Sequence, residues 1–362
     1  MSNTKYKRKA SGGANFMKKN IVAIAGLTLG LAVLNVAPQA NAHHGFAAHF
    51  DPDNIVRIEG TIKQYDFINP HSYLHIDTFD EDGEPIVYRC DLQARTHLMR
   101  HGHDETLFTV GESIVVLGFQ ARRDPHSCEY GVGYFEDGTS FTMRTIDEAE
   151  SQFAPGLATT SEEIGQESIF GNWIRPDIYD DYESGREPIY GLGSVMIPGE
   201  AARSVFDPIM DNPVIHCESG SPIRSWGAVG LATSISMADD QVIIYHETMD
   251  ATRIVHLGMT EHPADIVPSD LGHSIGYFEG DTLVVDSIGF SAGVLNGANQ
   301  NSEQMTMKEW ISFDEESGRL LIEFTVIDRR FYNQDIVGAQ YLQPTANEVL
   351  PYECLPEGRE VL

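Results

Sequence analysis

The chain has 362 residues, of which 41% are hydrophobic and 22% are charged, and its formal net charge at pH 7 is -30. This length is typical of about two domains, and the apolar fraction suffices for hydrophobic cores, which excludes a wholly disordered chain. Nucleic acids and anionic lipids bind basic surfaces, so the charge argues against either as a direct partner.

Residues 1–42 have the three parts of a secretory signal peptide. A basic stretch without acidic residues is followed by an uncharged apolar run at 21–36 and by the small-x-small cleavage site Ala40-Asn41-Ala42. Because the apolar run is short for a membrane anchor, we expect cleavage after Ala42 and export to the periplasm or the medium. We expect no membrane insertion after processing, since no later stretch is apolar enough to span a bilayer.

Residues 43–146 predict a small β domain. Apolar or alternating runs at 56–67, 72–80, 84–92, 112–121 and 140–146 indicate five strands separated by turn-rich segments. One helical stretch is expected at 92–102. Five strands and one helix in this length are typical of an OB-like barrel.

The segment 147–168 is acidic, small and polar, and it predicts a linker. After it, residues 169–362 predict a larger antiparallel β-barrel with one helix at 199–210. Hairpin turns are expected at MADD, FEGDT and DEESG, with Gly280 at the positive-φ position of FEGDT. The fold class predicted for the exported chain is therefore all-β, with two barrels.

All four cysteines follow the predicted signal peptide. An even number of cysteines in an exported protein indicates disulfides, and four cysteines allow three connectivities. We favour one bridge in each domain, namely Cys90–Cys128 and Cys217–Cys354.

The segment from His43 resembles the opening of a family of exported bacterial domains of unknown function. Mature chains of that family begin His-His, run through a Phe-Asp segment and an EGTV-like strand, and reach an Asn-Pro-His turn. The matching residues are His43, His44, Phe50, Asp51, Glu59, Gly60, Thr61, Asn69, Pro70 and His71. The resemblance extends over residues 43–145.

The second half resembles another exported family without an assigned activity, often fused behind the first. Its strongest motif, GHSIGxxEGDTLVVD, is present at 272–286. Where that family carries Glu-Arg on a later strand, this chain has Lys308 and Glu309. The domain opens on Gly-x-Trp, which also resembles lipocalins, and the resemblance implies a lipocalin-like barrel in which Arg329 or Arg330 covers Trp173.

Cleavage after Ala42 would leave His43 as the first residue. An N-terminal histidine offers its α-amino nitrogen and a ring nitrogen together, a chelate suited to Cu(II). A further imidazole would come from His44, His49, His71 or His75; the last two, four residues apart, would share one face of a strand. Copper is thus the candidate cofactor and zinc its competitor. The alternatives are a frayed polar terminus and a turn-capping role for His71.

Acid/base candidates lie in the second half. His273 stands in a glycine-flanked loop, where an imidazole can act as general acid or base or serve only as a hydrogen-bonded strut. Glu247 is expected inside the barrel, with His246 on the opposite face and Arg253 as the partner that a buried carboxylate needs. That pair is either structural or part of a ligand site. The candidate catalytic residues are His273, Glu247, Arg253 and Asp286, and the candidate ligand-binding residues are Tyr245, Trp226 and Tyr277.

The sequence lacks a P-loop, a Rossmann fingerprint, a GxSxG elbow and an HExxH motif, so no nucleotide cofactor is expected. We expect the larger barrel to bind a small, partly apolar molecule. If it also transforms that molecule, the reaction classes are hydration, isomerisation or lyase chemistry. The alternatives are a copper oxidase or carrier that uses His43, and an envelope adaptor whose protein partners the sequence does not identify.

Overall fold

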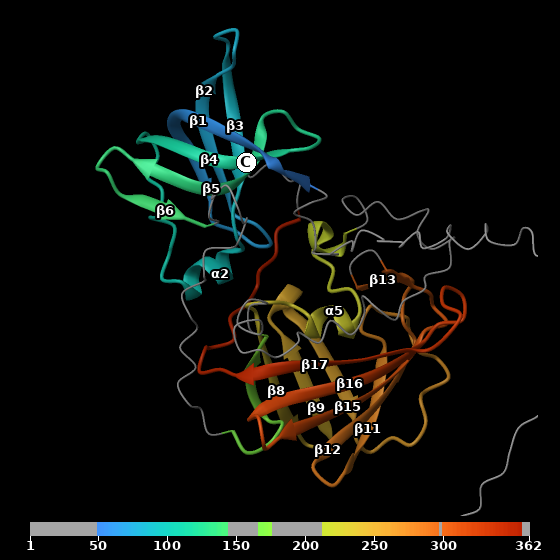
Figure 1. Ribbon diagram of the computed structural model, residues 1–362. Helices are drawn as coiled ribbons and strands as arrows, with labels where there is room; N and C mark the ends of the chain where they lie inside the picture. The colour runs from blue at the N-terminus through green and yellow to red at the C-terminus, as the bar shows by residue number, and fades with distance from the viewer. Residues whose placement is uncertain (1–48, 144–165, 176–211, 297–298, 357–362) are drawn as a thin grey trace, which may run out of the picture. The chain divides into compact units, whose positions relative to one another are not determined.

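The computed structural model describes residues 49–143, 166–175, 212–296 and 299–356. The predicted signal peptide, most of the predicted linker and the helix expected at 199–210 lie outside these ranges. The described residues are almost all β-structure and form one six-stranded sheet, one closed nine-stranded barrel and a separate strand pair (Figure 1). The predicted all-β class is confirmed.

The six-stranded sheet closes on itself. Its elements are β1 (Phe50–Asp66), β2 (Tyr73–Phe79), β3 (Pro85–Asp91), α2 (Arg95–Arg100), β4 (Ser113–Ala121), β5 (Ser127–Phe135) and β6 (Ser140–Thr142). The strand order is β3-β2-β1-β4-β5-β6, and β3 also pairs in parallel with β5. This extra pairing joins five strands into a ring with the helix between β3 and β4, which is an OB-like arrangement.

Strand β5 is the strand of the first domain that the sequence patterns miss. It contains Gly131 and Gly133, and glycine is depleted in strands because it has no side chain to pack. A Cβ atom on Gly133 would lie 2.1 Å from the hydroxyl oxygen of Tyr130, whose side chain is fully buried. The glycine is therefore explained by packing, since it leaves room for the aromatic ring.

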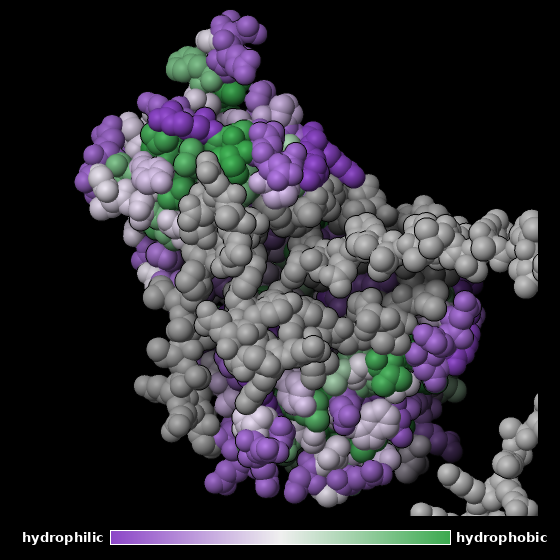
Figure 2. Space-filling view, viewed as in Figure 1, coloured by the Kyte–Doolittle hydropathy of each residue, from purple (hydrophilic) through white to green (hydrophobic). Residues whose placement is uncertain are grey.

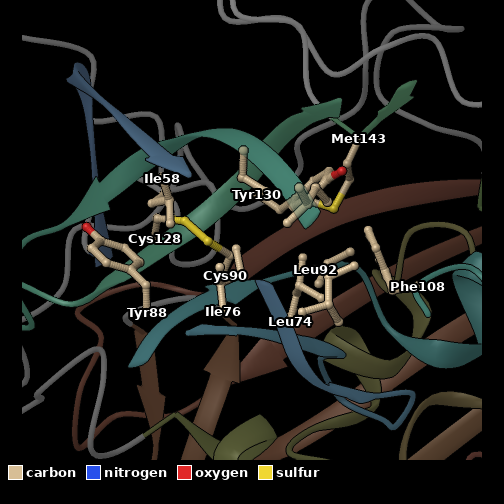
Figure 3. Packing of buried hydrophobic residues seen from close by; sticks show 13 residues of the cluster. Ile58, Leu74, Ile76, Tyr88, Cys90, Leu92, Phe108, Cys128, Tyr130 and Met143 are labelled. Atoms are coloured by element: carbon tan, nitrogen blue, oxygen red, sulfur yellow. A yellow bond between two sulfur atoms is a disulfide. The ribbon is translucent and has the colours of Figure 1, made fainter. Parts of the chain in front are cut away.

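The first domain has its own apolar core (Figure 3). Phe108 packs against Tyr65 and Tyr130, with ring centroids 4.9 and 5.7 Å apart. The Cys90–Cys128 disulfide joins β3 to β5 within this core, at paired positions of the two strands. The favoured pairing of these cysteines is confirmed.

The barrel consists of nine strands, and a short helix contributes to its interior. The elements of the second domain are β7 (Gly171–Ile174), η1 (Pro213–His216), α5 (Pro222–Trp226), β8 (Ala232–Ala238), β9 (Gln241–His246), η2 (Thr248–Asp250), β10 (Ala251–His256), β11 (His273–Glu279), β12 (Thr282–Ile288), β13 (Gly293–Asn296), β14 (Asn299–Asn301), β15 (Thr306–Asp314), β16 (Arg319–Ile327) and β17 (Ile336–Pro344). The barrel order is β10-β11-β12-β15-β16-β17-β7-β8-β9, while β13 and β14 pair separately.

The barrel departs from a wholly antiparallel one at a single pair. Strands β10 and β11 are parallel, so the chain crosses over between them through residues 257–272. All other neighbouring barrel strands are antiparallel. The predicted hairpin turns join β8 to β9, β11 to β12 and β15 to β16, and Gly280 has the expected positive φ of 61°.

The barrel interior is apolar in most places. Alternate residues of β9, β10 and β15 are buried, which is the period that one inward face requires. One buried apolar cluster includes Trp173, Val242, Ile311 and Ile322, and a second includes Phe290, Met307 and Phe324. Seven polar residues on the barrel strands are also buried: Thr233, His246, Arg253, Ser274, Ser287, Glu309 and Gln340. These polar residues define the candidate site.

The arginine contact expected from the lipocalin resemblance is wrong. Trp173 is fully buried, its indole nitrogen donates to the Ile169 carbonyl, and its ring lies 6.2 Å from that of Phe313. Arg329 and Arg330 are exposed, and Arg329 pairs with Asp335 instead. The indole donor is satisfied by the backbone and the ring by apolar neighbours, so no arginine is needed to cover it.

The second favoured disulfide, Cys217–Cys354, is also present. It ties the C-terminal segment to the residue that follows η1, across a sequence separation of 137 residues.

The described surface on the face shown in Figure 2 is largely hydrophilic, in keeping with the strongly acidic composition. Among the described residues, none of the helices has the length and apolar character that a membrane span requires.

Candidate functional site

A buried ion pair lies at the centre of the candidate site. Nη2 of Arg253, on β10, donates to Oε2 of Glu309, on β15, and the exposed fractions of these side chains are 1% and 0%. Oε1 of the same carboxylate accepts the indole N–H of Trp226 at 2.9 Å. Both oxygens of Glu309 are thus used, and its charge is matched by one guanidinium group.

Two serine hydroxyl groups also accept hydrogen bonds from the guanidinium group of Arg253. Nε of Arg253 donates to Oγ of Ser274 at 2.9 Å, and Nη2 donates to Oγ of Ser287 at 2.8 Å. The two hydroxyl oxygens are 2.9 Å apart and share a hydrogen bond. Arg253 is therefore held by groups from β11, β12 and β15, which fixes its side chain within the barrel.

A neutral histidine adjoins this ion pair. The ring of His246 stands edge-on to that of Trp226, with centroids 4.6 Å apart, and its Nδ1 lies 2.9 Å from Oγ1 of Thr233. Burial, with the nearby Arg253 charge as a second cause, lowers the pKa of His246 to about 3. The imidazole is therefore uncharged at neutral pH, with one nitrogen that can donate and one that can accept.

Three buried polar atoms near these groups have no hydrogen-bond partner among the described residues. They are Nη1 of Arg253, Nε2 of His246 and Oε1 of Gln340. Gln340 belongs to the same region because its Nε2 donates to the carbonyl of Ile223, on helix α5, which also carries Trp226. Buried polar groups in native proteins are nearly always paired, so such atoms call for a ligand or an internal water molecule.

The predicted pairing of Glu247 with Arg253 is wrong, and so is the predicted inward face of β9. Strand β9 ends at His246, which points inward, and Glu247 lies beyond it as the residue that precedes η2. Its carboxylate accepts from Nη2 of Arg100 at 2.5 Å and from the backbone N–H groups of Ala232 and Leu350. These bonds give Glu247 a structural role.

The other two aromatic ligand-binding candidates face away from the ion pair. The hydroxyl group of Tyr245 donates to Oδ1 of Asp250, and that of Tyr277 donates to Glu279. Tyr277 is half exposed, since it alternates with the inward Ser274 and Gly276 along β11. Trp226 is the only one of the three candidates that contacts the ion pair.

His273 and Asp286 do come together, but through a residue that the sequence analysis did not select. His262, in the crossover between β10 and β11, lies with Nδ1 2.9 Å from Nδ1 of His273 and with Nε2 2.9 Å from Oδ1 of Asp286. His256 stacks on His273 with ring centroids 5.1 Å apart. These residues are separate from the ion pair, because Ser274 and Ser287, their neighbours in sequence, point inward instead.

The predicted copper site is only partly within the described residues. His43 and His44 lie outside them. His71 precedes β2, which begins at Tyr73, so the expectation that His71 and His75 share a strand face is wrong. Nε2 of His75 lies 2.9 Å from Oδ2 of Asp66. Within the described ranges, no group of three or more His, Cys, Asp or Glu residues is arranged to hold a metal ion.

His97, on helix α2, and His101, the residue that follows the helix, pack against each other. The rings of His97 and His101 lie 4.3 Å apart, and burial lowers the pKa of His97 to about 3. A Cβ atom on Gly230 would lie 2.8 Å from Nδ1 of His97, so the imidazole fits closely against the backbone there. This contact explains why His97 is shielded from solvent.

The sequence reasoning missed Glu309 and His262 as site residues, and it placed His246 on the face of the strand opposite to the site. Glu309 carried one usable signal, because it is an acidic residue at an alternating position between Met307 and Ile311. His246 stands at the end of an apolar run, so its neighbours do not identify the face it occupies. His262 lies in a loop without a motif, and only the folded chain brings it to His273.

Comparisons with known proteins give little functional information. Residues 31–128 match a family of unknown function (DUF6152), which supports the resemblance predicted for the N-terminal segment. No curated protein matches the chain. A crystal structure of a mutant of the fluorescent protein UnaG is similar at 16% identity, with a TM-score of 0.21, over 32% of this chain and 73% of that one.

Proposed function

We propose that the barrel binds a small, uncharged, partly apolar molecule that carries a carbonyl or hydroxyl oxygen. The observation that carries this proposal is the set of three buried polar atoms without partners, on Arg253, His246 and Gln340. A guanidinium N–H donates, an amide oxygen accepts, and a neutral imidazole nitrogen does either. A ligand hydroxyl group among them can accept from Arg253 and donate to Gln340, whereas a ligand carbonyl oxygen can accept from Arg253 and from an imidazole N–H. Either would satisfy groups that are otherwise costly to bury.

The charge balance supports an uncharged ligand. The positive charge of Arg253 is already matched by Glu309, and His246 is neutral at pH 7. A carboxylate ligand would add a second negative charge beside Glu309, and that charge would be unmatched in a low-dielectric interior. A neutral carbonyl oxygen can accept from Nη1 of Arg253 without this cost.

The surroundings support a partly apolar body for the ligand. The polar residues are bordered by two apolar clusters, one with Ile244 and Val285 and the other with Phe324 and Ile336. Ligand sites combine such apolar walls with a few polar groups that fix orientation. Export of the protein, as its N-terminal sequence predicts, would give it access to molecules outside the cytoplasm.

The test uses prodan, a fluorescent and neutral naphthyl ketone, with the full-length exported protein. We expect saturable binding with a blue shift in emission, since the probe leaves water for an apolar site. A hydrogen bond from a charged donor contributes about 1.5–3 kcal/mol. The paired variant Arg253→Met with Glu309→Leu should therefore weaken binding on the order of 10- to 100-fold.

The control removes an exposed ion pair of the same domain. Arg329→Gln with Asp335→Asn should leave probe binding unchanged, because that pair is about half exposed and distinct from the buried polar residues. Thermal unfolding checks that the interior variant remains folded. Equal affinity of the folded interior variant and the wild type, or no saturable binding by the wild type, would refute the proposal.

A further inference from the structure

The crossover between β10 and β11 builds a hydrogen-bonded chain of three residues on the outer face of the barrel. Asp286 contacts His262, and His262 contacts His273, with both distances at 2.9 Å. We propose that these residues form a reactive site, separate from the interior binding site, in which Nε2 of His273 attacks small activated acyl compounds.

The carboxylate sets the direction of the hydrogen bonds. Ionised Asp286 only accepts, so Nε2 of His262 carries the proton of that bond. In neutral His262 the other nitrogen, Nδ1, is then an acceptor, and the facing Nδ1 of His273 must donate. His273 is thereby held in the tautomer whose Nε2 has a free lone pair, and Nε2 has no hydrogen-bond partner among the described residues.

The same chain can take up the proton that the reaction releases. When Nε2 of His273 forms a bond to the acyl carbon, the bond from that carbon to the leaving oxygen breaks, and the oxygen departs with the electron pair. The Nδ1 proton of His273 passes to Nδ1 of His262, and the resulting imidazolium lies beside Asp286. Water then cleaves the acyl-imidazole bond, which yields the carboxylic acid and leaves a proton on Nε2 of His273. The extra proton of His262 goes back to Nδ1 of His273, and the Nε2 proton passes through solvent to the leaving oxygen, which restores the starting tautomer.

The groups around His273 favour its uncharged form. His256, at the end of β10, stacks on the ring, and His262 faces it from the crossover. On β12 the nearest charge is Asp286, and Lys308 on β15 is the register partner of Asp286. Partial burial, followed by the charges that His262 and His256 would carry, lowers the pKa of His273. The nucleophilic form therefore persists to lower pH than in free imidazole.

The test measures the reactivity of individual histidines toward diethyl pyrocarbonate, which adds an ethoxycarbonyl group to an imidazole nitrogen and releases carbon dioxide and ethanol. Peptide mapping of the full-length protein at pH 7 gives the rate at each position. His273 should react on the order of tenfold faster than the exposed His126, because an oriented partner activates an attacking nitrogen. Asp286→Asn should reduce this advantage, and His262→Phe should remove it.

The matched control is Asp281→Asn, which removes an exposed carboxylate from the adjacent β-turn and should leave the rate at His273 unchanged. A parallel assay follows release of p-nitrophenolate from p-nitrophenyl acetate, which should fall in His273→Ala and stay unchanged in His126→Ala. Labelling of His273 no faster than His126, equal labelling in folded Asp286→Asn, or full ester hydrolysis by His273→Ala would each overturn the proposal. None of these readouts involves the barrel interior.

Discussion

Nη2 of Arg253 donates to Oε2 of Glu309 inside the barrel, although their strands β10 and β15 are separated by β11 and β12. The bond therefore connects parts of the barrel that no ladder of backbone hydrogen bonds joins directly. Because both side chains are excluded from water, each charge depends on the other for its compensation.

Glu309→Gln should destabilise the protein by about 3–5 kcal/mol, because it leaves the guanidinium of Arg253 buried without a counter-charge. Denaturant unfolding of the two proteins at pH 7 measures the difference. The paired variant Arg253→Met with Glu309→Leu should recover much of the loss, since it removes both charges together.

An exposed pair gives the matched control for this measurement. Arg57 and Glu59 lie 2.7 Å apart with more than half of each side chain exposed. Glu59→Gln should cost no more than about 1 kcal/mol, because water screens surface ion pairs. If Glu309→Gln cost as little as Glu59→Gln, the interior pair would not carry the dependence described above.

Glu247→Ala should loosen the C-terminal segment. The carboxylate accepts the backbone N–H of Leu350, and the variant leaves that N–H and the Arg100 guanidinium without their acceptor. Hydrogen exchange at the Leu350 amide should accelerate, and stability should fall by about 2 kcal/mol or more. Glu348→Ala, at an exposed position two residues earlier, should change neither quantity. Unchanged protection of Leu350 in Glu247→Ala would contradict the structural role assigned to this carboxylate.

Stability should fall as the pH drops from about 6.5 toward about 3, in part because of His246. Its pKa in the folded protein is about 3, below the ordinary value of 6.5. Between these values the unfolded chain binds a proton that the folded chain does not, so acid favours unfolding by up to about 1.4 kcal/mol per pH unit. Above 6.5 neither state is protonated and the contribution is constant.

The variant His246→Asn isolates this contribution. The asparagine side chain does not titrate. The unfolding free energy of the variant should therefore depend less steeply on pH between 4.5 and 6.5 than that of the wild type, and the difference in slope should correspond to the uptake of roughly one proton on unfolding. Denaturant titrations at several pH values provide the slopes. Identical slopes would show that His246 is not kept neutral by its burial.

Gly133→Ala should destabilise the first domain, because the new methyl group would lie 2.1 Å from the hydroxyl oxygen of Tyr130. Overpacking of a filled core costs about 1–3 kcal/mol. Tyr130→Phe removes the clashing oxygen, so the double variant should lose less stability than the sum of the two single variants. Additive losses would argue that the glycine is needed for its backbone alone.

Much of the architecture could be predicted from the sequence. Alternating strands and turn residues indicated the all-β class, the hairpin of 273–288 and the positive φ of Gly280, because these features depend on neighbouring residues. The even number of cysteines indicated two disulfides, and their division between the domains gave the observed pairs. Strand β5 escaped prediction because its glycines serve a contact with Tyr130 that local patterns do not contain.

The candidate sites could be predicted only in part, and the reason is physical. Residues 242–245 are Val, Ile, Ile and Tyr, so both faces of β9 are apolar and alternation does not reveal that His246 rather than Glu247 points inward. The sequence alone determined which residues carry charge, donors and acceptors, and which segments form strands. The tertiary structure decided their partners. Closure of the barrel makes the inward side chains of β10 and β15 face each other, and the connection between the parallel strands β10 and β11 places His262 next to His273. Partners so distant in sequence follow from the packing of whole strands, and no local pattern of residues encodes them.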